Sequence, residues 1–128
     1  GGDDSQVRGL VIQQFSGNGI AVKGASGILV TGSYIGTDVT GTIPLGNSNN
    51  GVLLDAGAKN NTIGGRVRSA GNVISGNGDT GSRTGYGVAI SGVGTSGNAV
   101  LGNHIGADRT GTAAIGNVRG GVHIENGA

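Results

Sequence analysis

Cysteine, methionine and tryptophan are absent from this chain of 128 residues, and proline occurs only once. The absence of cysteine excludes disulfide bonds and thiolate metal sites, although it does not identify the compartment of the protein. The three aromatic residues, Phe15, Tyr34 and Tyr86, are too few to form a platform on which nucleic-acid bases could stack.

Charge of either sign is also scarce, with eight Lys and Arg against seven Asp and Glu and a net charge of +1. These charges are scattered along the chain, so the long-range attraction that nucleic acid or an anionic membrane requires is missing. The longest uninterrupted apolar runs have three residues, as in 28–30, which is far too short to cross a bilayer. We therefore expect no nucleic-acid partner and no membrane insertion.

Glycine, by contrast, is abundant: the chain has 31 glycines, and Gly plus Pro make up a quarter of it. Such a composition indicates disorder unless a sequence period organises it. We expect residues 1–128 to form a single domain in which residues 1–6 are disordered. The opening GGDDS and the lack of a visible signal peptide lead us to interpret the chain as a fragment of a longer repeat protein.

A sequence period is indeed present. Residues 32–58 align with residues 102–128 at an offset of 70 positions, with 13 identities in 27 positions. Internal duplication at a fixed register is the signature of a repeat architecture, in which each unit buries its apolar face against its neighbours. Six of the identities are glycines, and the other seven are Ile35/Ile105, Asp38/Asp108, Thr40/Thr110, Thr42/Thr112, Asn47/Asn117, Val52/Val122 and Ala58/Ala128.

A shorter period lies inside this repeat, because short apolar segments of three kinds recur in a constant order. Segments of the first kind end in isoleucine, those of the second kind follow a glycine, and those of the third kind are centred on Leu29, Thr62 and Ala99. Segments of the first kind are 10–12, 33–35, 72–74 and 103–105, and those of the second kind are 20–22, 52–54, 88–90 and 122–124.

The composition of these segments indicates strands. Each segment is bounded by Gly, Asn, Ser or Thr, and most carry β-branched residues at alternating positions. No helical stripe of apolar residues is present, and each interior glycine would cost a helix about 1 kcal/mol. The sequence therefore predicts an all-β fold, a parallel β-helix (solenoid) with three short strands per rung and about three to four rungs.

Stacked strands of one kind lie about 4.8 Å apart, so equivalent side chains are expected to form columns along the solenoid axis. Glycines are predicted at the corners, and asparagine side chains are predicted to bond to the next rung, best at Asn61/Asn98 and Asn47/Asn117. The predicted inward columns are Ile12/Ile35/Ile74/Ile105, Ile20/Val52/Val88/Val122, Val22/Leu54/Ile90/Ile124 and Val30/Ile63/Val100.

The strings NVISGN, GNHIGADRTGTAAIGN, GVLLDAGAKNNTIGG and GVAISGVGTSGNAVLGN resemble the Gly- and Asn-rich repeats of right-handed parallel β-helix proteins of the pectin-lyase-like superfamily. The resemblance covers the chain from about Val7 onward. It implies a right-handed β-helix of a bacterial surface or secreted protein, and hence an extracellular or cell-surface location. That fold carries polysaccharide lyases and hydrolases as well as stalks and adhesins. No active-site motif of those enzymes is matched, so the resemblance assigns no catalytic residue, cofactor or metal ligand.

The repeated loop provides the first candidate site, at Asp38 and Asp108. Two aspartates in equivalent loops could hold a hard cation or a sugar hydroxyl. Alternatively, Asp followed by Thr and Gly forms an Asx-turn, in which the carboxylate accepts hydrogen bonds from its own backbone. We favour the structural interpretation, since calcium needs six or more oxygen ligands and an intervening rung is expected to separate the two loops.

A second candidate is the outward column of Lys23, Asp55, Ser91 and Glu125 beside the second kind of strand. Asp55 and Glu125 are predicted to lie two rungs apart, near the separation that paired glycosidase carboxylates require, and Lys23 could pair with Asp55. Charges exposed on a flat sheet usually only interact with solvent, and we favour that interpretation.

Two further features have weaker claims. His104 and His123 are predicted to point outward from adjacent sheets of the last rung, without the neighbours that a zinc site needs. Arg66 and Arg68 lie in a loop that could contact an acidic sugar, although a solvated loop is the commoner explanation.

Two functions remain open from the sequence. We expect a structural segment, a spacer or adhesion scaffold without catalytic activity, that self-associates through its open ends or strand edges into a homo-oligomer. The alternative is a carbohydrate-active domain that binds or cleaves polysaccharide.

Overall fold

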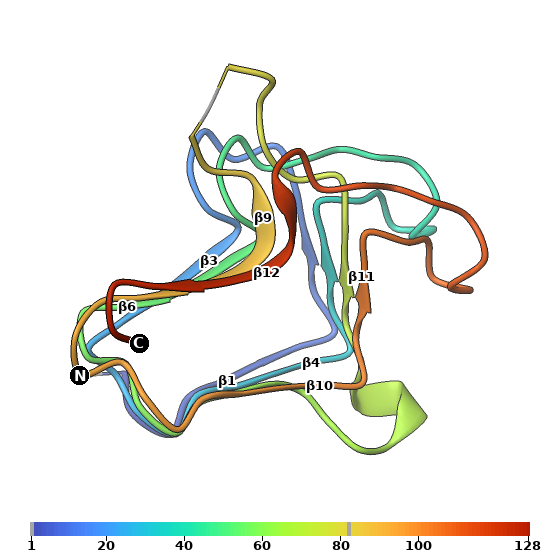
Figure 1. Ribbon diagram of the computed structural model, residues 1–128. Helices are drawn as coiled ribbons and strands as arrows, with labels where there is room; N and C mark the ends of the chain where they lie inside the picture. The colour runs from blue at the N-terminus through green and yellow to red at the C-terminus, as the bar shows by residue number, and fades with distance from the viewer. Residues whose placement is uncertain (1, 82) are drawn as a thin grey trace.

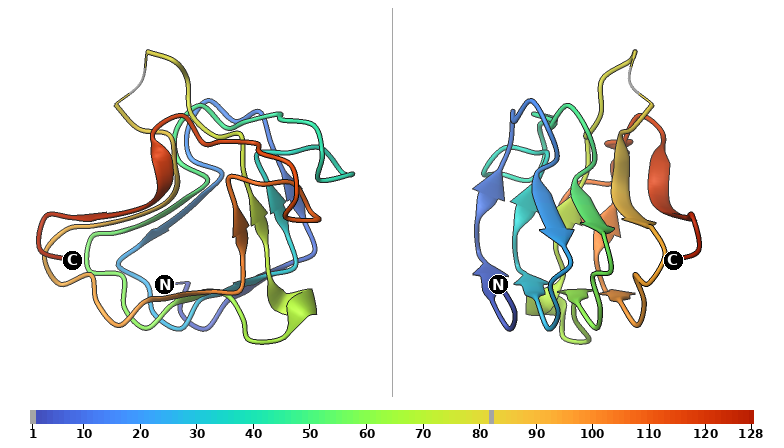
Figure 2. Two further views of the ribbon diagram at one scale, coloured as in Figure 1. Left: turned by 45° about the vertical axis from the view of Figure 1, so that its right-hand side comes forward. Right: turned by 90° about the vertical axis from the view of Figure 1, so that its left-hand side faces the viewer.

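The computed structural model describes residues 2–81 and 83–128 and is an all-β solenoid of about three turns, built from three parallel four-stranded sheets. Figure 1 views the solenoid along its axis, and Figure 2 shows the rungs lying side by side. Sheet A contains β1 (Gln6–Arg8), β4 (Leu29–Thr31), β7 (Thr62–Gly64) and β10 (Ala99–Leu101). Sheet B contains β2 (Val11–Ile12), β5 (Tyr34–Ile35), β8 (Val73–Ile74) and β11 (His104–Ile105). Sheet C contains β3 (Ile20–Lys23), β6 (Val52–Asp55), β9 (Tyr86–Ser91) and β12 (Gly120–Glu125).

The strand registers confirm all four predicted inward columns. In sheet B, Ile35 pairs with Ile12 on one side and with Ile74 on the other, and Ile74 pairs with Ile105. Residues 35 and 105 therefore occupy one column two rungs apart, as the offset of 70 predicted. The remaining columns have the predicted members in sheet C and in sheet A.

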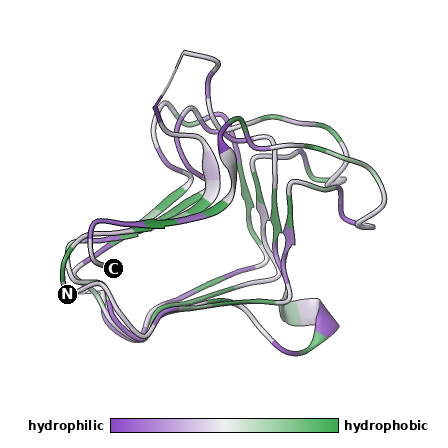
Figure 3. Ribbon diagram, viewed as in Figure 1, coloured by the Kyte–Doolittle hydropathy of each residue, from purple (hydrophilic) through white to green (hydrophobic). Residues whose placement is uncertain are grey.

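These columns form the hydrophobic core. Their central members are fully buried, and Figure 3 shows the hydrophobic residues gathered along the strands. Each fully buried aliphatic side chain contributes about 1.5–3 kcal/mol to folding. The fully buried aliphatic residues of the columns are Val30, Ile35, Val52, Leu54, Ile63, Ile74 and Val88.

Asparagine ladders fix the three corners of the solenoid. The Asn61 Nδ2 donates to the Asn98 Oδ1 at 2.9 Å, which confirms the first predicted ladder. Asn47 and Asn117 also share a ladder, but Asn77, which the prediction omitted, lies between them and bonds to both. The third ladder joins Asn72 to Asn103 between sheets A and B. Each ladder amide also donates to a backbone carbonyl, so the polar corners stay satisfied although they are largely buried.

Glycine has a specific role directly before the apolar segment of each sheet C strand. A Cβ added at Gly51 would lie 2.5 Å from the Ile74 Cγ2 and 2.7 Å from the Gly87 carbonyl oxygen. Gly87 has the equivalent environment one rung later, against Ile105 and the Gly121 carbonyl. The glycine that recurs before the segments of the second kind is therefore needed wherever a further rung follows, because a side chain there would collide with the inward isoleucine column and with the next rung.

The structure departs from the sequence prediction in several details. β1, with the single apolar residue Val7, extends the third kind of strand to a fourth member and was not predicted. β9 and β12 are six residues long, whereas the predicted segments 88–90 and 122–124 have three residues each. Within the segment expected to be disordered, Gln6 begins β1, the Asp4 N–H donates to the Ser26 carbonyl, and residue 1 lies outside the described residues.

Helix is almost absent from residues 2–81 and 83–128. The single short 3-10 turn η1 (Arg68–Ala70) lies in the connection between sheets A and B. Across the described residues, no helix has the length and hydrophobicity to span a membrane.

Candidate functional site

The outer face of sheet C carries a hollow with a cavity volume of about 310 Å³. Its floor is built by outward residues of three neighbouring strands: Leu53 is in register with Ala89, and Ala89 with His123. Ala89 is the smallest of the three, so the floor is lowest in the middle rung. Loop residues that precede the strands form one wall. We call this the sheet C hollow. The side chains that line it include Asp55, Arg83, Tyr86, Ser91, His123 and Glu125.

Two rings lie stacked at this hollow. The ring centroids of Tyr86 and His123 are 4.3 Å apart, and the ring planes differ by 5°. Gly120 is the register partner of Tyr86, and because it has no side chain the tyrosine ring can lie over it. The sequence indicated no contact between Tyr86 and His123, so this flat aromatic surface is a finding of the structure.

The structure places Asp55 and Glu125 at the same hollow, but both carboxylates already have partners. The Asp55 Oδ1 accepts a hydrogen bond of 2.6 Å from the Ala56 N–H and so stabilises the turn that follows β6. The Glu125 Oε2 lies 3.3 Å from the His123 Nε2. Ser91 occupies the rung between them, which puts the strands of the two acids about 10 Å apart.

Lys23 is brought into register with Asp55, as predicted. Within residues 2–81 and 83–128, however, the only ion pair is that of His123 with Glu125, so Lys23 and Asp55 do not form the pair that the sequence left open. The Asp55 carboxylate is instead turned toward its own backbone, and Lys23 is exposed at the first strand of the sheet.

The loops of Asp38 and Asp108 have the geometry of Asx-turns. The Asp38 carboxylate accepts hydrogen bonds from the Thr40 hydroxyl and from the N–H groups of Thr42 and Ile43. Asp108 repeats this arrangement with Thr110, Thr112 and Ala113. The structure thus supports the structural interpretation of these aspartates, because the oxygens that a cation would need are used within each loop.

The same hydrogen bonds control the protonation of both aspartates. Partial burial alone would raise the pKa of Asp38, but the Thr40 hydroxyl and the backbone N–H groups of residues 40, 42 and 43 outweigh it and lower the pKa below 3.8. The pKa of Asp108 is lowered from the same value in the same way, by the Thr110 hydroxyl and the backbone N–H groups of residues 110, 112 and 113 against the opposing effect of burial. Both carboxylates therefore stay ionised at neutral pH.

One expectation about these loops was wrong. The rung that separates them in sequence does not separate them in space, because it turns tightly at residues 75–77 while both long loops extend outward. The Arg109 N–H donates directly to the Gly41 carbonyl at 2.9 Å, so the loops stack on each other. Figure 1 shows both loops projecting on the side of β11.

The remaining sequence candidates are distributed over two sheets. His104 and His123 lie on β11 and β12, on outward positions of adjacent sheets as predicted. Arg68 lies in η1 beside the strands of sheet B and faces His104 across a second hollow, whereas Arg66 does not line it. Over the described part of the chain, no three His, Asp or Glu side chains come together in a way that could hold a metal ion.

Several residues of these sites were missed by the sequence analysis. Asn77 gave a signal that could have been used, because SGN at 75–77 repeats the turn chemistry of the other corners. Arg83 and Arg109 gave none, since nothing in the spacing of either loop indicates which sheet face its arginine reaches. Comparisons of the chain with models of known protein families, with curated proteins and with solved structures find no match.

Proposed function

We propose that this chain is a structural β-solenoid segment of a bacterial surface or secreted protein, of pectin-lyase-like ancestry, and that it serves as a rigid spacer or adhesion scaffold. In this role it has no catalytic activity of its own, and it acts outside the cell or at its surface. Its partner is another solenoid end, in the simplest case a second copy of the chain.

The observation that carries this proposal is the state of the two ends. β12 continues the columns of sheet C, but Val122 is 49% and Ile124 is 61% exposed, whereas their column neighbours Val88 and Ile90 are 0% and 7% exposed. Each sheet also ends in a strand with one unpaired edge, namely β10, β11 and β12 at one end and β1, β2 and β3 at the other. Parallel edges with apolar columns beside them favour pairing with further strands.

The partners of the two acids in the sheet C hollow agree with a non-catalytic role. Glycoside hydrolysis needs two carboxyl groups that face each other across the substrate, about 5–10 Å apart. Asp55 is held by the backbone of its own turn and Glu125 is paired with His123. Neither is therefore poised as a free acid or nucleophile.

Sedimentation velocity over a range of concentrations tests the proposal. We expect the wild-type chain to associate as its concentration rises, and Ile124→Lys to weaken this association because it places a charge among the exposed ends of the columns. The matched control is Val39→Lys, which adds the same charge on a loop residue that is 74% exposed and lies away from both ends. A wild-type chain that stays monomeric at high concentration, or equal behaviour of the two variants, refutes the proposal.

A second candidate function, polysaccharide binding at the sheet C hollow, is favoured by the stacked pair of Tyr86 and His123. A sugar ring packs well on a flat aromatic surface, and the nearby Arg83, Asp55 and Glu125 offer hydrogen-bonding groups for hydroxyls. These residues support binding more than cleavage, because Asp55 and Glu125 already have partners within the chain.

Calorimetric titration with neutral and acidic oligosaccharides separates the two candidates. If the hollow binds sugar, Tyr86→Ala should abolish the heat of binding, whereas Phe15→Ala, which removes an exposed ring outside the hollow, should leave it unchanged. Incubation with pectate-type and alginate-type polymers, with and without calcium, should yield no ultraviolet-absorbing unsaturated products. Product formation would assign an enzymatic role and reverse the order of the candidates.

A further inference from the structure

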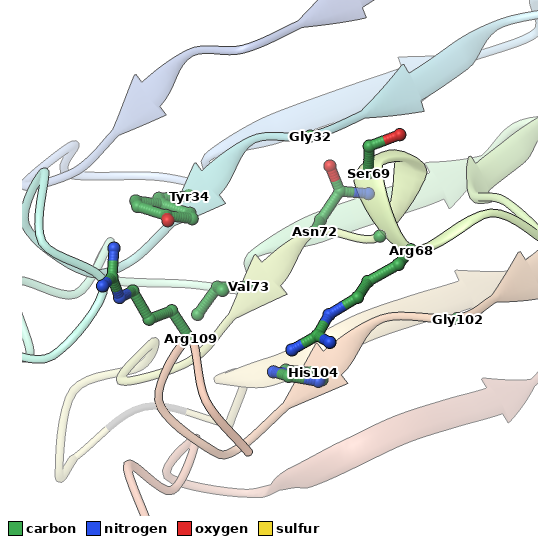
Figure 4. A pocket seen from close by; sticks show the side chains of 10 residues that line it. Gly32, Tyr34, Arg68, Ser69, Asn72, Val73, Gly102, His104 and Arg109 are labelled. Carbon is green, nitrogen blue, oxygen red and sulfur yellow. The ribbon is translucent and has the colours of Figure 1, made fainter.

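A second hollow lies on the outer face of sheet B, on a different side of the solenoid from the sheet C hollow. Its floor is the outward column Tyr34, Val73 and His104, whose members are in register on β5, β8 and β11. Val73 is shorter than the two rings that flank it, and the resulting cavity has a volume of about 270 Å³. We call this the sheet B hollow; Figure 4 shows it from close by.

Two arginines come to this hollow from separate loops. Arg68 extends from η1 on one side and points toward His104 in the view of Figure 4. Arg109 comes from the stacked loop on the other side and lies beside Tyr34, since a Cβ added at Gly41 would contact both the Arg109 Cβ and the Tyr34 ring. The hollow thus has an arginine side chain on each of two sides.

The positive charge of this hollow is not neutralised by a direct partner. In the described ranges 2–81 and 83–128, no carboxylate forms an ion pair with Arg68 or Arg109. The nearest acid in the sequence, Asp108, directs its carboxylate into its own loop, where the Thr110 hydroxyl and three backbone N–H groups bond to it. Both arginines are exposed and free to turn their N–H groups toward a ligand.

His104 adds a third polar group with a fixed orientation. Its Nδ1 lies 3.1 Å from the Asp108 carbonyl oxygen. A carbonyl oxygen can only accept, so Nδ1 carries the proton of this hydrogen bond and the ring is held against its own loop. Across the described residues Nε2 has no hydrogen-bond partner, which leaves it available to a ligand.

We propose that the sheet B hollow binds a small molecule that carries a tetrahedral oxoanion, a phosphate or sulfate ester of a sugar-sized ring. Arginine forms pairs of parallel N–H···O bonds with such groups. Arginines on two sides suit a tetrahedral ester group, whose three terminal oxygens offer a different pair to each arginine, better than a carboxylate, which has only one such pair.

The size of the cavity adds the second part of the ligand. Pockets for drug-sized molecules begin at about 300 Å³. A volume of about 270 Å³ therefore suits one small ring together with its oxoanion, and exceeds what an inorganic anion alone would fill. The ring would lie over Val73, between Tyr34 and His104. This inference stands apart from the proposed function, because it uses neither the solenoid ends nor the sheet C hollow.

Isothermal titration calorimetry at constant ionic strength tests the inference, with glucose 6-phosphate, glucose 6-sulfate, glucuronate, glucose and inorganic phosphate as probes. We expect glucose 6-phosphate or glucose 6-sulfate to bind most tightly, and the comparison of the two identifies which ester is preferred. Arg68→Gln and Arg109→Gln should each weaken that binding by about tenfold or more. The matched control is Arg119→Gln, which removes the same charge from an exposed position outside the hollow and should change the affinity less than about twofold.

Circular dichroism of each variant confirms that these exposed substitutions leave the fold intact. Backbone amide shifts in NMR spectra should move at residues 32–34, 68–73 and 102–109 on titration with the tightest probe. Four results would overturn the inference: absence of binding at millimolar ester, tighter binding of glucuronate than of either ester, equal binding of inorganic phosphate, and equal loss in Arg119→Gln.

Discussion

The interior rungs and the last rung of this solenoid carry nearly the same residues in the same register, yet only the interior rungs are buried. Val88 and Val122 belong to one column of sheet C, and they are 0% and 49% exposed. Ile90 and Ile124 show the same contrast. The residues are equivalent in the chain, so the difference comes entirely from the rung that covers β9 and that β12 lacks. In this fold a neighbouring rung, rather than the residue itself, supplies the burial.

The largest expected contrast is between two isoleucines. Ile74→Ala removes a fully buried side chain from the centre of the sheet B column, and we expect it to lower the free energy of unfolding by about 4 kcal/mol. Ile124→Ala removes a largely exposed one and should cost less than about 1 kcal/mol. Urea unfolding of both variants at low protein concentration measures the difference. Equal losses would contradict the assignment of β12 as an open end.

The asparagine ladder should show the next largest contrast. Asn77 is fully buried, donates to the Ile35 carbonyl and the Asn117 Oδ1, and accepts from the Asn47 amide, so Asn77→Ala leaves several buried polar groups without partners. We expect a loss of about 3 kcal/mol in the free energy of unfolding.

The same substitution at the end of this ladder provides the comparison. Asn117 is only half-buried, so water can replace the bonds lost in Asn117→Ala, and the cost should be about 1 kcal/mol. Thermal melts of both variants test this order. The ladder explanation fails if Asn117→Ala is the more harmful change.

A smaller contrast is expected at the glycines that precede the apolar segments of sheet C. Gly51→Ala would force a Cβ against Ile74 and the Gly87 carbonyl, and should cost about 2 kcal/mol. Gly121 is the equivalent residue of the last rung, where the nearest atom to an added Cβ is 3.6 Å away. Gly121→Ala should therefore be nearly neutral in chemical unfolding. A neutral Gly51→Ala would show that the turn relaxes more easily than its packing indicates.

The smallest effect on stability is expected at the two Asx-turns. There, substitution in an interior rung and in the last rung should have the same effect. Each carboxylate is bonded within its own loop, so Asp38→Asn and Asp108→Asn should lower stability to a similar, small extent at neutral pH. Since hydrogen bonds lower the folded pKa of each aspartate below 3.8, its contribution is present above that value and is lost as the pH falls through the folded pKa.

Unfolding curves recorded from about pH 6 down to about pH 2 should therefore converge for the wild type and both variants at the acid end. A variant whose deficit persists at the acid end would show that the carboxylate acts through something other than its charge.

The sequence predicted the columns and much of the ladders because these depend on short, local patterns. Alternating β-branched residues, a glycine before each apolar segment of sheet C and asparagine at the corners each specify the local structure of one rung, and stacking repeats it. Ile35 and Ile105 could be placed in one column on this basis alone. The fragment Gln6-Val7-Arg8 was missed because one valine between polar residues makes no recognisable strand.

The hollows could not be predicted because they depend on how far each loop extends. Residues 75–77 turn tightly, which lets the loops of Asp38 and Asp108 meet and brings Arg109 beside Tyr34. Nothing in either loop specifies that contact, since the cause lies in the rung between them. The stack of Tyr86 on His123 likewise depends on the missing side chain of Gly120 in a different strand.

Hydrogen exchange of β9 and β12 tests most directly whether the last rung is an open end that awaits a partner. At a dilution where sedimentation gives the mass of one chain, we predict strong protection of the amides of 86–91 and fast exchange in 120–125. As the concentration rises, protection of 120–125 should approach that of 86–91. Equal protection of both strands in the single chain, or fast exchange of 120–125 that no concentration changes, would contradict the account.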